Sequence, residues 1–299
     1  MSHQPSFFDP QPPSGRGDAL VRFGTSSFSA PEWLGTFYPR GTKPGDFLRY
    51  YATQFDTVEV DATYYHIPAP GTVDSWVCKT PGDFSLAAKF PRSIVHAGET
   101  TDPDSTRVLL PDATYADRDA FLEVMSRLGA RLGPLVLQFP HFPRECFASP
   151  AQFLERLDRF LEDLPEGFCY CVEIRNRTWI DARFASVCRR HGVAMVLVDR
   201  VHMPHADEIM RQLDPVTGSF AYVRLLGDRR RIEAITARWD REVIDRRSSL
   251  ERWAQVLVRL SERAVPTFVY ANNHYAGHAP TTVRRLHQMY TQAIDRRAR

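Results

Sequence analysis

The sequence lacks the long apolar runs and terminal signals that direct a chain into or across a membrane. No stretch approaches the roughly 18 consecutive apolar residues that a membrane-spanning helix needs. Residues 1–17 combine four prolines with serine and glycine, and they contain neither the basic nor the apolar segment of a signal peptide. We therefore expect residues 1–19 to form a disordered, proline-rich tail, and we expect a cytoplasmic location with no membrane partner.

The sequence also has few cysteines and a small net charge. The five cysteines are an odd number without the paired CxxC spacing of zinc sites, so we expect reduced thiols. Cys169 and Cys171 lie two residues apart in an apolar run, where buried small hydrophobic residues are a better explanation than a metal pair. The formal net charge of +2 is far from the basic excess of most nucleic-acid-binding domains.

Several nucleotide- and metal-binding motifs are also missing. No GxGxxG follows the first predicted strand and no GxxxxGK[ST] occurs, which argues against dinucleotide-binding and P-loop folds. The HxH and HExxH spacings of common metal sites do not occur either.

What the sequence does contain is a regular alternation of short apolar runs and longer amphipathic segments. The predicted strands are residues 21–25, 57–61, 85–90, 135–139, 169–175, 194–199, 221–226 and 267–272. The predicted helices are residues 45–54, 72–79, 116–132, 150–164, 181–191, 248–264 and 280–297. The sixth connection, between Asp199 and Phe220, holds two prolines and a glycine without a helical stripe, so its crossover is irregular.

This alternation requires a parallel sheet with helices outside it, because crossover connections are almost always right-handed. Eight units favour closure into a (β/α)₈ TIM-type barrel, which typically uses about 250 residues as one domain. With 43% hydrophobic residues the chain has enough material for such a core. We predict a single barrel domain over residues 20–299.

Nearly every predicted strand ends in a polar residue, where barrels carry their chemistry. These residues are Glu59, Asp61, Lys89, Gln138, Glu173, Arg175, Asp199, Arg224, Asn272 and Asn273. The period of two along a strand places Glu59 with Asp61, and Glu173 with Arg175, on a common face. Buried charges are costly unless paired or bound to a ligand. The set is therefore either a structural ion-pair network or, as we favour, a mixed-charge ligand pocket.

Several runs, taken in order, resemble the domain-of-unknown-function 72 (YecE-like) family. They include FGTSSF (23–28), WLGTFYP (33–39), FDTVEVDATYY (55–65), AKFP (88–91), GPLVLQFP (133–140), VEIR (172–175), YVR (222–224) and YANN (270–273). The resemblance implies the same type of barrel and brings no assigned reaction with it. The chain departs from the family pattern at Asp61, usually Asn, at His66, usually Arg, and at Leu226, usually His.

Our main functional hypothesis is an enzyme that performs acid–base chemistry on a small anionic or carbohydrate-like substrate. Glu59, Lys89 and Glu173 are the catalytic candidates, with the two carboxyls separated in pKa to serve as acid and base. The carboxylates should raise the pKa of Lys89, which favours an ion-pair role over a Schiff base. The substrate-binding candidates are Asp61, Tyr65, His96, Gln138, Arg175, Trp179, Asp199, Arg224, Asn272 and Asn273.

The rim aromatics have two interpretations. Trp33, Tyr38, Tyr64, Tyr65 and Trp179 either form a stacking wall beside the substrate or anchor loops on the barrel.

Two alternatives to this hypothesis stay open at the sequence level. The sequence requires no cofactor, but a divalent-metal hydrolase or isomerase would find ligands among Glu59, Asp61, Glu173, Asp199, His96 and His274. A non-catalytic or nucleic-acid-binding barrel would use the arginine clusters at 229–231, 246–247 and 296–297. Neighbouring acidic residues make solvated helix faces the better explanation for these clusters.

Overall fold

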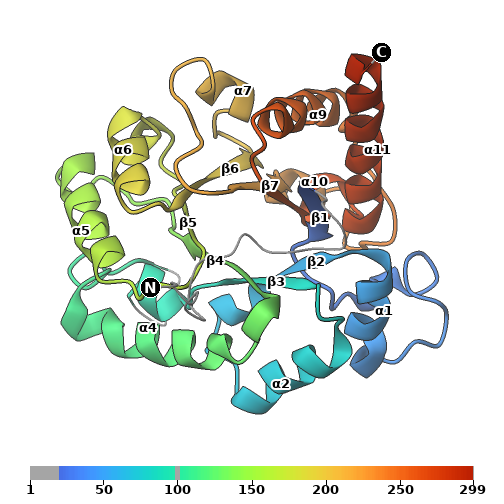
Figure 1. The fold of residues 1–299 in the computed structure, drawn as a ribbon, viewed down its shortest axis with the longest axis horizontal. Helices are drawn as coiled ribbons and strands as arrows, with labels where there is room; N and C mark the ends of the chain where they lie inside the picture. Colours follow the sequence, from blue (N-terminus) through green and yellow to red (C-terminus); the bar gives the residue numbers. More distant parts are fainter. Residues whose placement is uncertain (1–19, 98–101, 299) are drawn as a thin grey trace, which may run out of the picture.

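The computed structural model describes residues 20–97 and 102–298, and it confirms a (β/α)₈ barrel of the TIM type (Figure 1). The expected tail at residues 1–19 lies outside the described residues. The eight strands are β1 (Val21–Thr25), β2 (Thr57–Val60), β3 (Ser85–Lys89), β4 (Leu132–Gln138), β5 (Tyr170–Glu173), β6 (Ala194–Arg200), β7 (Ala221–Gly227) and β8 (Thr267–Ala271). Every recorded pairing between them is parallel.

The longer helices cover the outside of the barrel. The helices of the described chain are α1 (Phe47–Gln54), α2 (Pro70–Lys79), α3 (Arg92–Val95), α4 (Pro111–Ser126), α5 (Pro150–Glu162), α6 (Ala182–Arg190), α7 (Ala206–Ile209), α8 (Arg229–Glu233), α9 (Arg247–Glu262), α10 (Asn273–Ala276) and α11 (Ala279–Ala298). The irregular sixth crossover is confirmed, because the only helix between β6 and β7 in the described chain is the single turn α7. Within these described residues, no helix is both long and apolar enough to cross a membrane.

The predicted helix over residues 116–132 is shifted along the chain in the structure. Helix α4 begins five residues earlier, at Pro111, because proline at the first helical position needs no backbone hydrogen bond. It ends at Ser126, and Gly129 follows shortly in the left-handed region with φ +54°. Leu132, which the prediction placed at the end of the helix, begins β4 instead.

Strands β1 and β2 meet at a seam that differs from the other contacts between strands. The hydrogen-bonded order runs from β1 through β8 and back down to β2, and within the described residues β1 and β2 share no ladder. The Tyr51 hydroxyl of α1 bridges the gap, accepting from the Thr25 amide at 2.8 Å and donating to the Thr57 carbonyl at 3.2 Å. Gly24 allows the close approach, since a Cβ atom there would lie 2.2 Å from the Thr57 carbonyl oxygen.

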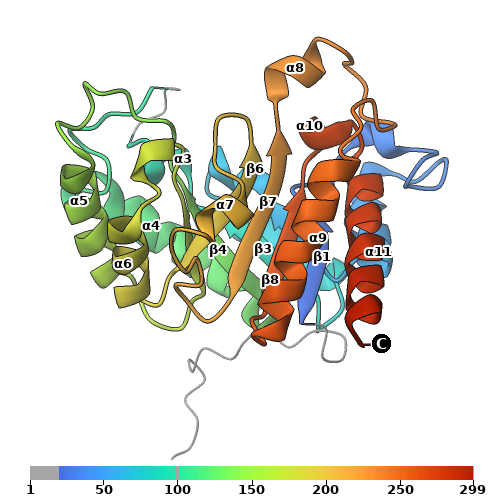
Figure 2. The same cartoon turned by 90° about the horizontal axis from the view of Figure 1, so that it is seen from above.

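Alternating side chains divide the interior into two regions. One face of each strand joins the large core beneath the helices, and the other fills the barrel axis with a smaller cluster. Members of this inner cluster include Ala87, Val136, Cys171, Val196, Val198, Phe220, Tyr222, Phe268 and Tyr270. In Figure 2, β7 points toward α8 and α10, which lie at the C-terminal end of the barrel above this apolar filling.

Candidate active site

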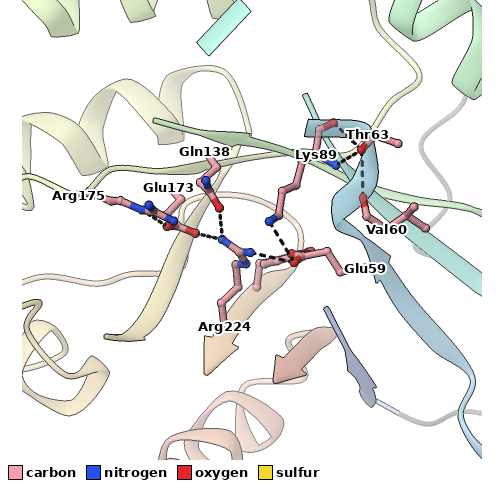
Figure 3. Close-up of polar contacts among 9 residues, drawn as sticks. Glu59, Val60, Thr63, Lys89, Gln138, Glu173, Arg175 and Arg224 are labelled. Carbon is pink, nitrogen blue, oxygen red and sulfur yellow. Dashed lines mark hydrogen bonds and ion pairs between the residues drawn. The ribbon is translucent and has the colours of Figure 1, made fainter. Parts of the chain in front are cut away.

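Arg224 is the centre of a buried polar network at the C-terminal ends of the strands (Figure 3). From β7 its guanidinium reaches across the barrel, where Nη2 donates to Glu59 Oε1 of β2 at 2.9 Å. Nη1 donates to Gln138 Oε1 of β4 at 2.7 Å and also to Glu173 Oε2 of β5. The second oxygen of Glu59 accepts from the Tyr222 hydroxyl at 2.7 Å. Residues from four strands are thus joined through one side chain.

The two carboxyls of this network stay ionised. Burial is the largest single effect and would raise their pKa values. The charge of Arg224, that of Lys89 at Glu59 or Arg175 at Glu173, and the hydrogen bonds of the network together outweigh it. The pKa of Glu59 is therefore lowered, and that of Glu173 falls to about 2. Neither carboxyl therefore has the raised pKa that the sequence-based hypothesis needs for its acid, because both share one counterion.

Lys89 occupies the inward-facing end of β3 beside this network. Its side chain is 10% exposed, and its Nζ lies 4.0 Å from Glu59 Oε1. Among the described residues this is the shortest polar contact of the Lys89 side chain. Its Nζ also lies over the Tyr64 ring, 5.8 Å from the ring centroid. Thr63 fixes the end of the strand, because its hydroxyl accepts from the Lys89 amide at 3.0 Å.

The pKa of Lys89 is shifted in the direction opposite to the one we predicted. Burial is the largest cause and the positive charge of Arg224 the second, and together they lower the pKa to about 8. The carboxylates of Glu59, Asp61 and Glu173 act the other way but do not compensate. The prediction failed because burial and the charge of Arg224 together outweigh the three carboxylates.

Asp61 lies at the start of the 3₁₀ turn Asp61–Tyr64 that follows β2, and it is half-buried. Burial raises its pKa, although the charge of Lys89 opposes the change. On the same turn, the Tyr64 hydroxyl lies 2.6 Å from Nε2 of His96, while the Tyr65 side chain is 68% exposed at the rim. Three of the sequence candidates, Asp61, Tyr65 and His96, therefore belong to one edge of the strand-end site.

Arg175 and Arg200 form the opposite edge of the site. Arg175 follows Glu173 on the same face and donates from Nε to Glu173 Oε1 at 3.1 Å (Figure 3). Arg200 ends β6 two residues beyond the inward-facing Val198, and sequence reasoning missed it by ending the strand one residue early. The alternation of Val196 and Val198 was the signal that could have identified it.

Asp199 faces away from the site, contrary to expectation. Its Oδ2 accepts hydrogen bonds from Ser249 at 2.5 Å, Trp253 at 2.8 Å and Tyr275 at 2.8 Å. Ser249 and Trp253 belong to α9 on the outside of the barrel. The error follows from alternation, because neighbours on a strand point to opposite faces.

Several of the polar and aromatic candidates hold loops together. Trp179 packs at 5.2 Å from the Phe153 ring and within 6.2 Å of two other phenylalanines. Asn273 accepts from Trp33 Nε1 at 3.2 Å, and Tyr38 stacks on Phe47 at 4.3 Å. Their geometry fits the loop-anchor interpretation. Asn272, in contrast, has a buried Oδ1 with no hydrogen-bond partner in the described structure.

The ligands proposed for a divalent metal do not come together in the described part of the chain. Across residues 20–97 and 102–298, no group of three or more His, Cys, Asp or Glu side chains is placed to hold a metal ion. His274 pairs with Glu233 at 3.4 Å, away from the other proposed ligands. In the basic segments, Arg229 also pairs with Glu233, at 2.7 Å, as a solvated helix face would.

Comparisons with known proteins agree with this architecture. The family described as "Protein of unknown function DUF72" matches residues 22–298. The UPF0759 protein YecE of Escherichia coli is 29% identical over 201 residues, a match that spans 64% of each chain. The solved structure of a DUF72 family protein from Thermotoga maritima is 28% identical, with a TM-score of 0.67 over 90% of this chain and 98% of that one. The chain belongs to the DUF72 family.

Proposed function

We propose that the protein is an enzyme that transfers a proton to or from a small anionic or carbohydrate-like substrate, with Lys89 as the proton-transferring group. The observation that carries this proposal is the placement of the Lys89 amino group. It is buried, faces the barrel axis at a strand end, and has its nearest carboxylate oxygen 4.0 Å away. A lysine with a purely structural role would form a charge-assisted hydrogen bond at about 2.8 Å.

The protonation equilibria of the site support the same role. With a pKa of about 8, Lys89 is neutral in about a tenth of molecules at pH 7, so it can both donate and accept a proton. Asp61 is shifted in the opposite sense, with its pKa raised by burial. Both shifts move the pKa toward neutral pH, where a general acid or base is most effective. Asp61 is therefore the second proton carrier in this proposal.

Glu59 and Glu173 have a different role here from the one their sequence positions first indicated. Because Arg224 holds both as carboxylates, neither exchanges a proton near neutral pH. Glu59 instead limits the fall in the pKa of Lys89 and positions its amino group. We treat Glu59, Glu173, Gln138 and Arg224 as the positioning residues of the site.

Proton exchange provides a test that does not require the net reaction. We would incubate the protein in D₂O with a panel of hydroxycarboxylates and sugar phosphates and follow loss of carbon-bound hydrogen by NMR. One or more compounds should exchange with the wild-type protein, and Lys89→Met should abolish the exchange. The half-buried Lys79 is one of only three lysines in the chain, so Lys79→Met is the matched control. Exchange that persists in folded Lys89→Met refutes the proposal.

A further inference from the structure

Two arginines from neighbouring strands meet at the mouth of the barrel. Strands β5 and β6 pair in parallel, with Cys171 opposite Ala194 and Val172 opposite Met195. Arg175 lies two residues beyond Glu173 and contacts it. Arg200 lies two residues beyond the inward-facing Val198 and next to the outward-facing Asp199, at a point where the register against β7 shifts. Both side chains are half-buried, and they are close enough for the charge of Arg175 to act on Arg200.

The positive charge of these arginines is only partly neutralised by the protein. Glu173 is shared, since one oxygen accepts from Arg175 at 3.1 Å and the other from Arg224. Arg200 has no recorded ion pair or side-chain hydrogen bond within the described residues. Burial, and next the charge of Arg175, lowers the pKa of Arg200, although the carboxylates of Glu173 and Asp228 oppose the change. The fold therefore holds two guanidiniums near one another at a cost that a bound anion would remove.

We propose that Arg175 and Arg200 form an oxyanion-binding site that holds the carboxylate or phosphate group of the substrate. This inference rests on the proposed function, because the site positions the rest of the substrate toward Lys89. A planar guanidinium donates two parallel hydrogen bonds to such a group, and a pair of them surrounds it. The Arg175 side chain is 24% exposed, so an anion can reach it from solvent.

Tyr64 links the two edges of the site. Its ring lies 5.8 Å from Lys89 Nζ on one side. On the other side, the charge of Arg175 acts on its hydroxyl, as does that of Arg92. A small substrate anchored at Arg175 and Arg200 would therefore extend along Tyr64 to the amino group of Lys89. The buried Oδ1 of Asn272, which lacks a partner in the described structure, is a further acceptor at a strand end for a substrate hydroxyl.

Calorimetric titration tests the anion site directly. Inorganic phosphate and malonate would be titrated separately into the protein at fixed ionic strength, which separates a phosphate site from a carboxylate site. We expect saturable binding of at least one of them with a stoichiometry of one. Arg200→Gln should weaken it by about tenfold or more, as expected for lost charge-assisted hydrogen bonds, and Arg200→Lys should weaken it less. Arg211→Gln, at an exposed arginine on the same connection, should leave it unchanged.

The outcomes distinguish this inference from the proposed function. If neither anion binds, or if folded Arg200→Gln binds as the wild type does, the oxyanion site is refuted. Lys89→Met should retain anion binding, and its loss in the folded variant would also refute the assignment to the two arginines. Anion binding that depends on Arg200, in a protein that exchanges no substrate hydrogen, would refute the proton-transfer proposal and support this one.

Discussion

Replacing Arg224 by methionine should destabilise the barrel strongly and reverse how its stability depends on pH. The change leaves Glu59 and Glu173 buried without their shared counterion. Breaking a buried ion pair from one side costs about 3–5 kcal/mol. The stability that the ionised form of Glu173 contributes can be worked out separately from its pKa, which falls from 4.5 to about 2 in the folded state. At about 1.4 kcal/mol for each pH unit, this contributes about 3 kcal/mol.

The sign of the pH effect follows from proton linkage. In the wild type the pKa of Glu173 is lower in the folded state, so its contribution is complete above the unfolded value and is lost as the pH falls toward 2. In Arg224→Met, burial without that counterion should raise the pKa values of both Glu59 and Glu173 above those of the unfolded chain. The folded variant then takes up protons, so its free energy of unfolding should rise between pH 7 and pH 5.

Urea denaturation at pH 7, 6 and 5 measures both effects. The triple variant Arg224→Met, Glu59→Gln, Glu173→Gln removes the charges together and should recover much of the lost stability. Arg127→Met, which breaks the exposed pair with Asp74, is the control for loss of an arginine at the surface. A loss below about 1 kcal/mol in Arg224→Met, or a stability that falls further at pH 5, would contradict the role assigned to Arg224.

Three further predictions address other parts of the molecule. Glu59→Gln removes the carboxylate 4.0 Å from Lys89, so the pKa of Lys89 should fall below 8. NMR of ¹³C-lysine-labelled protein, in which only three lysines give signals, measures this pKa from the titration of the Lys89 Cε signal, and a rise would contradict the prediction. Asp199→Ala leaves three donors without their acceptor and should cost about 1–3 kcal/mol in urea denaturation while proton exchange persists. Gly24→Ala forces a Cβ against the Thr57 carbonyl and should lower the melting temperature by several degrees, whereas an unchanged value would mean that the seam can widen.

The barrel itself could be predicted from the sequence because hydrophobic periodicity and connection length are local properties. The strand predicted over residues 21–25 has the same bounds as β1, and the prolines and glycine of the sixth crossover predicted its irregular structure. The errors arose at boundaries. Ending β6 at Asp199 rather than Arg200 assigned the wrong side chain to the site, because one residue reverses the face of a strand.

The chemistry of the site depended on information that no local pattern contains. Glu59, Lys89, Glu173 and Arg224 were all recognised as strand-end charges. Which partners Arg224 reaches across the barrel is a property of the closed fold, and it decides that both glutamates stay ionised. The closed fold also reverses the predicted pKa shift of Lys89, because it buries the amino group and places it near the positive charge of Arg224.

The seam between β1 and β2 has a consequence for how the chain matures during synthesis. Within the described sheet, β1 forms a ladder with β8 alone, pairing Val21 with Thr267 and Thr25 with Ala271. During synthesis β1 therefore has no strand to pair with until β8 has been made. Until then, side-chain contacts must hold it against the growing barrel, such as those through the Tyr51 phenol and from Arg22 to the Asp83 carbonyl.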